Sequence, residues 1–202
     1  DKKENLNYVV EEAAIRKAVN DADCILIMVH GLIGDTSDKA KIMERIKEKG
    51  TGRTVSDIYD VLLTFDYESM NRRIQKTGVD LKNKLEAVGI KAGHGKKIHI
   101  IAHSMGGLVS RWYLEKEGGQ DVISHFIQVG SPNLGSPIAN KAQLATTALG
   151  AILNFIPKPP LVAGAIRLAG TLWNRATVTT RQLNPKSKFY EKLNGENKQG
   201  SE

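Results

Sequence analysis

The most constraining feature of this chain is residues 97–117, where an apolar run, a glycine-rich turn and a helical pattern follow one another directly. The isoleucines of residues 98–101 predict a buried strand, and Leu108 and Trp112 recur at helical spacing after the glycines. Ser104 falls at the junction. The strand, the turn and the helix together present this serine at the tip of a sharp turn.

A serine at such a turn has a chemical use. A serine hydroxyl is a poor nucleophile unless it stands clear of the backbone, is reached by a base and is flanked by main-chain N–H donors. Close packing of strand and helix needs small residues two places before and after the serine, and Ala102 and Gly106 occupy these positions. The alternative is a tight strand-to-helix turn without chemistry, because A-x-S-x-G strings also occur by chance.

An upstream segment supplies the context that a five-residue motif lacks. Residues 24–34 predict a second buried strand that ends at His30 and Gly31. In enzymes with a nucleophile elbow, one oxyanion donor is the N–H after the serine and the other comes from such a loop. We therefore expect the N–H groups of Leu32 and Met105 to form an oxyanion hole.

Four motifs in this order resemble the bacterial lipase and esterase branch of the α/β-hydrolase superfamily. They are VHGLIG, LTFDYES, IIAHSMGGLVSRWYLE and VGSPNLGSPIA; the resemblance spans roughly residues 24–140 and continues more weakly to residue 195. Alanine at the first elbow position is similar to a subgroup of Bacillus-type lipases. The resemblance implies Ser104 as nucleophile and the N–H groups of Leu32 and Met105 as oxyanion hole, with no metal or organic cofactor. It also implies a supporting motif of His30, Gly31, His103, Gly106 and Gly107.

The rest of the chain predicts a single α/β-hydrolase domain over residues 1–202, incomplete at its C-terminus. Alternating strands and helices imply a mostly parallel sheet with helices on both faces. The expected helices are 9–19, 39–49, 69–88 and the elbow helix, and the expected strands are 24–30, 61–67, the elbow strand and 122–129.

Residues 138–182 interrupt this alternation as a lid or cap segment. Within them, the sequence of residues 142–173 predicts two apolar helical stretches split by prolines, each too short to span a bilayer. We expect them to line an acyl pocket beside the serine, and the alternative is a pair of ordinary core helices.

Composition bounds the partners. The net charge is +7, but the basic residues are scattered and no nucleic-acid-binding motif occurs. We therefore expect a solvated basic surface with mild attraction to anionic lipid, and we do not expect nucleic-acid binding. The single cysteine, Cys24, excludes an intramolecular disulfide and a cysteine metal site. A cytoplasmic location is slightly favoured, with secretion as the alternative if a signal peptide was removed before Asp1.

The catalytic acid and histidine are not evident. Superfamily order is serine, acid, histidine, yet no histidine follows His125, and Asp121 is the only aspartate after Ser104. His94 would be the first candidate base if the chain were active alone. Three explanations stay open: the partners lie in a further part of a longer hydrolase, a separate C-terminal fragment supplies them, or the chain is a catalytically dead binding domain.

The sequence therefore predicts a serine hydrolase of carboxylic esters that forms an acyl-enzyme on Ser104. Fatty-acyl or other apolar esters are the expected substrates, with transient contact to a membrane or lipid-droplet surface. Acyl transfer or amide cleavage on the same fold is an alternative chemistry. Asp66 and Tyr67 are expected to be structural, Asn133 a turn former, and Arg111 a packing or surface residue.

Overall fold

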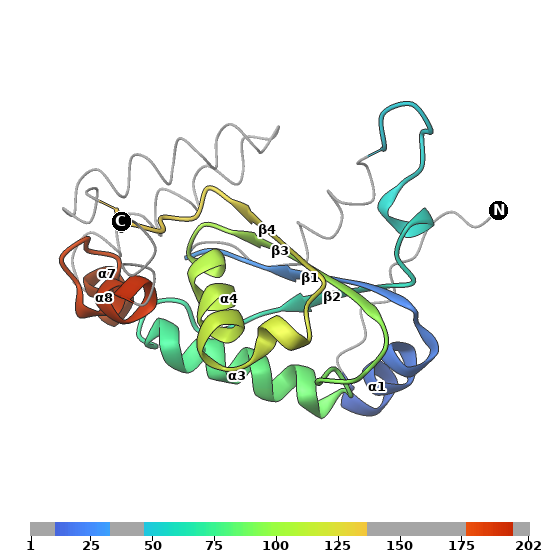
Figure 1. Cartoon of the computed structure of the whole chain (residues 1–202), viewed down its shortest axis with the longest axis horizontal. Coiled ribbons are helices and arrows are strands. Elements are labelled where there is room, and N and C mark those ends of the chain that lie inside the picture. The colour runs from blue at the N-terminus through green and yellow to red at the C-terminus, as the bar shows by residue number, and fades with distance from the viewer. Residues whose placement is uncertain (1–10, 33–46, 137–176, 196–202) are drawn as a thin grey trace, which may run out of the picture.

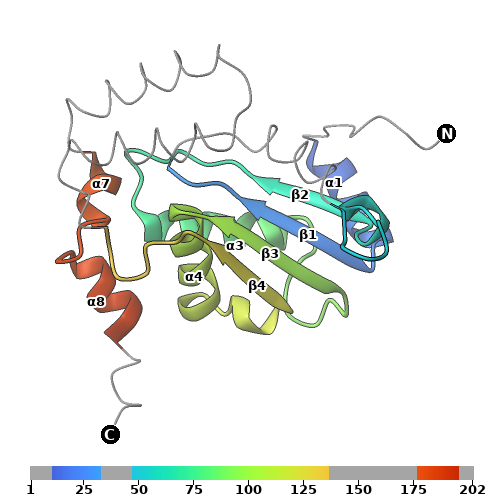
Figure 2. The same ribbon diagram turned by 90° about the horizontal axis from the view of Figure 1, so that it is seen from above.

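A four-stranded parallel sheet forms the centre of the molecule in the computed structural model, which describes residues 11–32, 47–136 and 177–195. The strand order is β2-β1-β3-β4, and each neighbouring pair of strands runs parallel. The strands are β1 (Cys24–Val29), β2 (Val61–Phe65), β3 (Lys97–His103) and β4 (His125–Val129). Figure 2 shows them side by side, with β1 and β3 in the middle. The parallel α/β architecture expected from the sequence is confirmed.

The two faces of this sheet differ in burial along β3 and β4. Ile25, Ile27, Ile98 and Ile100 are at most 1% exposed and belong to the hydrophobic core beneath the helices. Side chains alternate between faces along a strand, so the residues between these isoleucines point the other way. On β4 that second face is exposed at residues 125, 127 and 129.

Helices cover one face of the sheet. Figure 1 shows α3 (Ile74–Ala87) and α4 (Met105–Lys116) lying against it, with α1 (Glu12–Asp21) at its end. The two helices approach closely at Gly78, because a Cβ there would lie 2.9 Å from the Trp112 ring. Shorter helices complete the described parts: η1 (Val55–Asp57), η2 (Gly119–Asp121), α7 (Val178–Gln182) and α8 (Lys188–Asn194).

Two expected helices differ from the structure. Helix α3 begins at Ile74 rather than at residue 69, because the carboxylate of Glu68 accepts the N–H groups of Met70 and Asn71 and holds a turn there. The helix expected over residues 39–49 is wrong at its end: Lys47 pairs with Thr54 in an antiparallel bridge. Both differences come from polar contacts that hydrophobic periodicity does not report.

The expected lid segment, residues 138–182, lies largely outside the described residues. Its end forms α7, which is fastened to the start of α3: the Thr179 N–H donates to the Met70 carbonyl at 3.1 Å, and the Ile74 N–H donates to Gln182 Oε1 at 2.8 Å. In the parts of the chain that the structure describes, no helix is long and apolar enough to cross a membrane.

Candidate active site

Ser104 occupies an unusual backbone conformation at the end of β3. Its φ and ψ are 53° and −124°, and it is the only residue other than glycine with positive φ among those described. Such a conformation costs on the order of 1–3 kcal/mol and persists only where surrounding structure enforces it. The Ser104 N–H donates to the Val129 carbonyl at 2.9 Å, and its side chain does not cap α4. The serine is thus presented at a strained strand-to-helix turn.

Small residues permit this turn. Ala102 is fully buried in the core, and a Cβ on Gly106 would overlap the His30 carbonyl oxygen and lie 2.7 Å from that of Val29. A Cβ on Gly107 would overlap the Ser131 hydroxyl. The first turn of α4 therefore packs directly on the end of β1, as the elbow requires.

The loop after β1 lies against the serine. A Cβ on Gly31 would be 2.9 Å from the Ser104 Cβ and 3.1 Å from His103 Nδ1, so only glycine allows this approach. The next residue, Leu32, is buried, and its carbonyl accepts a hydrogen bond from the Ser69 hydroxyl at 2.8 Å. The structure therefore brings the expected oxyanion loop to the expected nucleophile.

His30 has a structural role at this loop. It is 4% exposed; its Nδ1 lies 2.7 Å from the Gly31 carbonyl oxygen, and its Nε2 accepts the Tyr67 N–H at 3.3 Å. The Tyr67 ring stacks on it with centroids 4.2 Å apart, and the Tyr67 hydroxyl donates to the His30 carbonyl at 2.6 Å. Burial raises the pKa of Tyr67, which keeps that hydroxyl a donor. Asp66 contributes an oxygen 3.7 Å from His30 Nε2.

The other histidines do not supply an evident base. His94 precedes β3, with its Nε2 2.8 Å from the Val122 carbonyl oxygen. Since the seven residues of β3 span roughly 20 Å, His94 lies too far from Ser104 to accept its proton, and Asp121 in η2 lies at the same remote end. His99 and His125 contact one another near the beginnings of β3 and β4, also remote from Ser104.

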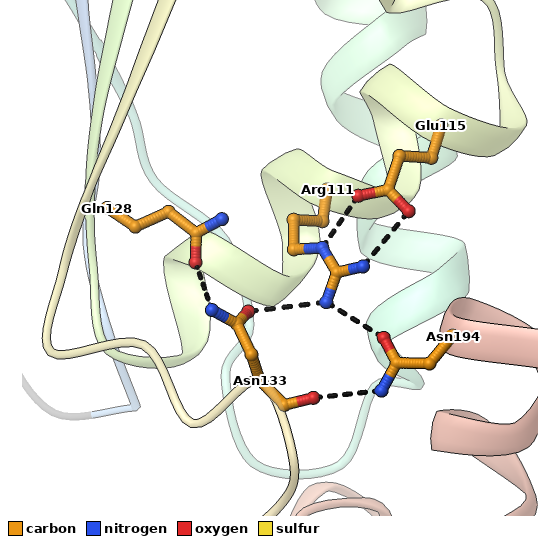
Figure 3. Close-up of polar contacts among 5 residues, drawn as sticks. All are labelled: Arg111, Glu115, Gln128, Asn133 and Asn194. Carbon is orange, nitrogen blue, oxygen red and sulfur yellow. Dashed lines mark hydrogen bonds and ion pairs between the residues drawn. The ribbon is translucent and has the colours of Figure 1, made fainter. Parts of the chain in front are cut away.

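Arg111 is a feature that the sequence interpretation missed. It is 8% exposed rather than a surface residue, and it donates to both carboxylate oxygens of Glu115, at 2.6 and 3.0 Å. It also donates to Asn133 Oδ1 at 3.3 Å and Asn194 Oδ1 at 3.0 Å, as Figure 3 shows. Asn133 in turn donates to Gln128 at 2.8 Å. The only local signal was the i,i+4 spacing of arginine and glutamate, which is common on exposed helices.

In residues 11–32, 47–136 and 177–195, no group of three or more His, Cys, Asp or Glu side chains is arranged to hold a metal ion.

A family model described as "Domain of unknown function (DUF7379)" matches residues 2–202. The chain belongs to this family. The DUF7379 chain is also 31% identical over 110 residues to the lysosomal thioesterase PPT2-B of Xenopus laevis, a match that covers 54% of this chain and 36% of that protein.

Solved structures show which fold this chain has. The Bacillus licheniformis lipase BlEst2 in its mature form matches with a TM-score of 0.54 at 20% identity, over 87% of this chain and 60% of that one. Phospholipase PlaB from Legionella pneumophila matches with a TM-score of 0.51 at 18% identity, over 85% and 35%. The DUF7379 chain thus has an α/β-hydrolase fold, and it spans between about a third and three fifths of the length of these relatives.

Proposed function

We propose that this DUF7379 chain carries the nucleophile of a serine hydrolase that cleaves carboxylic esters through an acyl-enzyme. The observation that carries the proposal is the positive φ of Ser104 at the turn between β3 and α4. An outlier of this kind, on a serine whose side chain does not cap the helix, is what presentation of a nucleophile requires. The lipase, phospholipase and thioesterase names of its relatives support hydrolysis.

In the proposed reaction, Ser104 Oγ attacks the substrate carbonyl and its proton passes to a histidine. The N–H groups of Leu32 and Met105 stabilise the oxyanion, which collapses to expel the alcohol and leave an acyl-serine. Water then releases the acid and regenerates the hydroxyl. The approach of Gly31 to Ser104 supports this use of the loop after β1.

We place the histidine and its acid partner outside these 202 residues. His30 is committed to Gly31 and Tyr67, and His94 lies at the remote end of β3. The longer relatives leave room for such residues, either in a longer polypeptide or in a separate fragment. A binding domain without catalysis is the competing proposal.

The substrate is proposed to be an apolar acyl ester, with an acyl thioester as second candidate because the matched Xenopus relative is named a thioesterase. The lid proposed for residues 138–182 would select the acyl chain, and the segment would bring the protein into transient contact with lipid surfaces. Esters and thioesters share the attacked carbonyl and differ in the leaving group, so one site serves both.

A fluorophosphonate probe on the protein as the cell makes it tests the proposal. Labelling is expected in the wild type and in Ser110→Ala, a buried serine of the same helix, and is expected to disappear in Ser104→Ala. The kcat/KM values for p-nitrophenyl butyrate and for butyrylthiocholine then show whether the ester or the thioester is the better substrate. A folded protein with neither labelling nor turnover would favour the binding domain, and labelling that survives Ser104→Ala would remove Ser104 from the mechanism.

A further inference from the structure

A cluster of three rings lies at the end of the sheet remote from Ser104. His99 and His125 are register partners on β3 and β4, and Tyr59 precedes β2. His99 alternates with the core residues Ile98 and Ile100, so it points to the face away from α4. His125 is exposed and His99 and Tyr59 are partly buried, which leaves the cluster open to solvent on one side.

The rings form a chain of short polar contacts. His99 Nε2 lies 3.1 Å from His125 Nδ1, and the Tyr59 hydroxyl lies 2.9 Å from His99 Nδ1. The two imidazoles are nearly perpendicular, at 80°, with centroids 4.6 Å apart. The nitrogens of two residues from different strands therefore face one another.

We propose that His99 and His125 form a two-imidazole site for a divalent transition metal that joins β3 to β4. Two nitrogens each about 2.0–2.1 Å from one ion are separated by roughly 2.9–3.4 Å for square-planar to tetrahedral geometry, which includes the observed spacing. For both lone pairs to meet the ion, each must point roughly 40° away from the line that joins the two nitrogens, so both rings must turn. Water would occupy the remaining positions, since the described residues provide no third ligand of the usual types.

Tyr59 contacts the nitrogen of His99 that does not face His125. A histidine that binds a metal through one nitrogen usually donates its other N–H to a neighbouring oxygen, which fixes the ring and its tautomer. The Tyr59 oxygen is already in place to accept from His99 Nδ1.

The proposal predicts a stabilising ion at an edge of the described sheet. Within the described residues β4 has a strand partner on one side, β3, and the ion would add a second type of link between the two strands. The site is independent of the proposed hydrolase, because it lies at the opposite ends of these strands from Ser104.

Titration of the untagged chain with Ni²⁺ and Zn²⁺ by calorimetry tests this site. One ion per chain is expected at micromolar concentration, with a rise in Tm. His125→Asn and His99→Asn should each weaken binding at least tenfold, and Tyr59→Phe by about tenfold, as expected for an outer partner. His94→Asn, which changes a histidine near the same end of the sheet, should leave affinity unchanged.

Nuclear magnetic resonance separates this site from binding to a lone surface histidine. Zn²⁺ should shift the ring signals of His99 and His125 together and leave that of His94. Absence of saturable binding up to about 100 μM would overturn the proposal, as would affinity that persists in His125→Asn. Because His125 is exposed, that variant is expected to fold even if His99→Asn does not.

Discussion

At the scale of single residues, Ser104 shows how a fold stores strain at one point. Its positive φ is enforced by the pairing of its N–H with Val129 and by Gly31 against its Cβ. Neither contact is local in sequence. The strain is therefore imposed by neighbouring strands, and removal of the side chain should reveal its cost.

Ser104→Gly is expected to be more stable than Ser104→Ala by about 1 kcal/mol. Glycine adopts positive φ without steric cost, which should outweigh the roughly 0.5–1 kcal/mol that it loses to alanine in chain entropy. Urea unfolding of the two variants measures the difference, and neither retains a nucleophile. If the alanine variant were the more stable, the strain interpretation would be wrong.

At the scale of elements, the Arg111 network joins three parts of the chain that no strand pairing connects. It links α4 to the loop after β4 through Asn133 and to α8 through Asn194 (Figure 3). Asn194 also donates to the Asn133 carbonyl at 3.0 Å. The loop thus held includes Ser131, which packs against Gly107 at the start of α4.

Arg111→Met should lower the free energy of unfolding by roughly 2–3 kcal/mol, because it leaves the two asparagines without their shared donor and Glu115 without its partner. The free energy of unfolding of Arg111→Lys should lie between those of the wild type and Arg111→Met, since lysine cannot make the bidentate contact with the Glu115 carboxylate. Glu115→Gln serves as control and should change less, because that side chain is 36% exposed and reaches water. A loss below about 0.5 kcal/mol for Arg111→Met would show that the network contributes little.

Asp60 links the beginnings of β1 and β2 and should make stability sensitive to acid. One of its oxygens accepts the N–H groups of Asp23 and Cys24, at 2.9 and 2.8 Å, and these bonds lower its pKa. A carboxyl whose pKa is lower in the folded state contributes its full stabilisation of the fold at pH values above its unfolded pKa of about 3.9. This contribution is lost as the pH falls through the pKa of the folded state.

Asp60→Asn should therefore be less stable than the wild type at pH 7. As the pH falls below about 4, it should lose less stability than the wild type does. Chemical unfolding at a series of pH values measures both effects. Equal acid sensitivity of the two proteins would assign the pH dependence to other carboxyls.

At the scale of the whole molecule, parallel strands bring the residues of the candidate site together at the carboxyl ends of the strands. The loop after β1 and the turn after β3 meet because β1 and β3 are adjacent and run in the same direction. The histidine pair lies at the opposite ends of β3 and β4, which keeps the two proposed sites apart.

The 202-residue chain by itself should hydrolyse esters very slowly. Removal of the histidine from a comparable triad lowers kcat by on the order of 10⁶ and leaves roughly 10³ over the reaction in water. Hydrolysis of p-nitrophenyl butyrate by a sample whose intact mass matches 22.1 kDa measures the rate. Turnover at ordinary enzymatic rates would require one of the five histidines as base and would contradict the proposal that the base lies elsewhere.

Features that depend on neighbours in the chain followed from the sequence alone. The strand, turn and helix of residues 97–117 and the buried strand from Cys24 are set by local periodicity and by glycines at the turn, so their existence and their order were predicted. The parallel sheet followed from that order, because alternating strands and helices pack in few other ways.

Features that depend on distant segments were decided by tertiary structure. Arg111 contacts Asn194, 83 residues away, and the His99 and His125 rings meet only because β3 and β4 pair in one register. No local pattern encodes such contacts, since they arise when the core aligns the strands and thereby places polar side chains together. The sequence predicted a nucleophile at Ser104 from its local motif. The positive φ of this residue depends on the packed sheet, for the same reason as the contacts above.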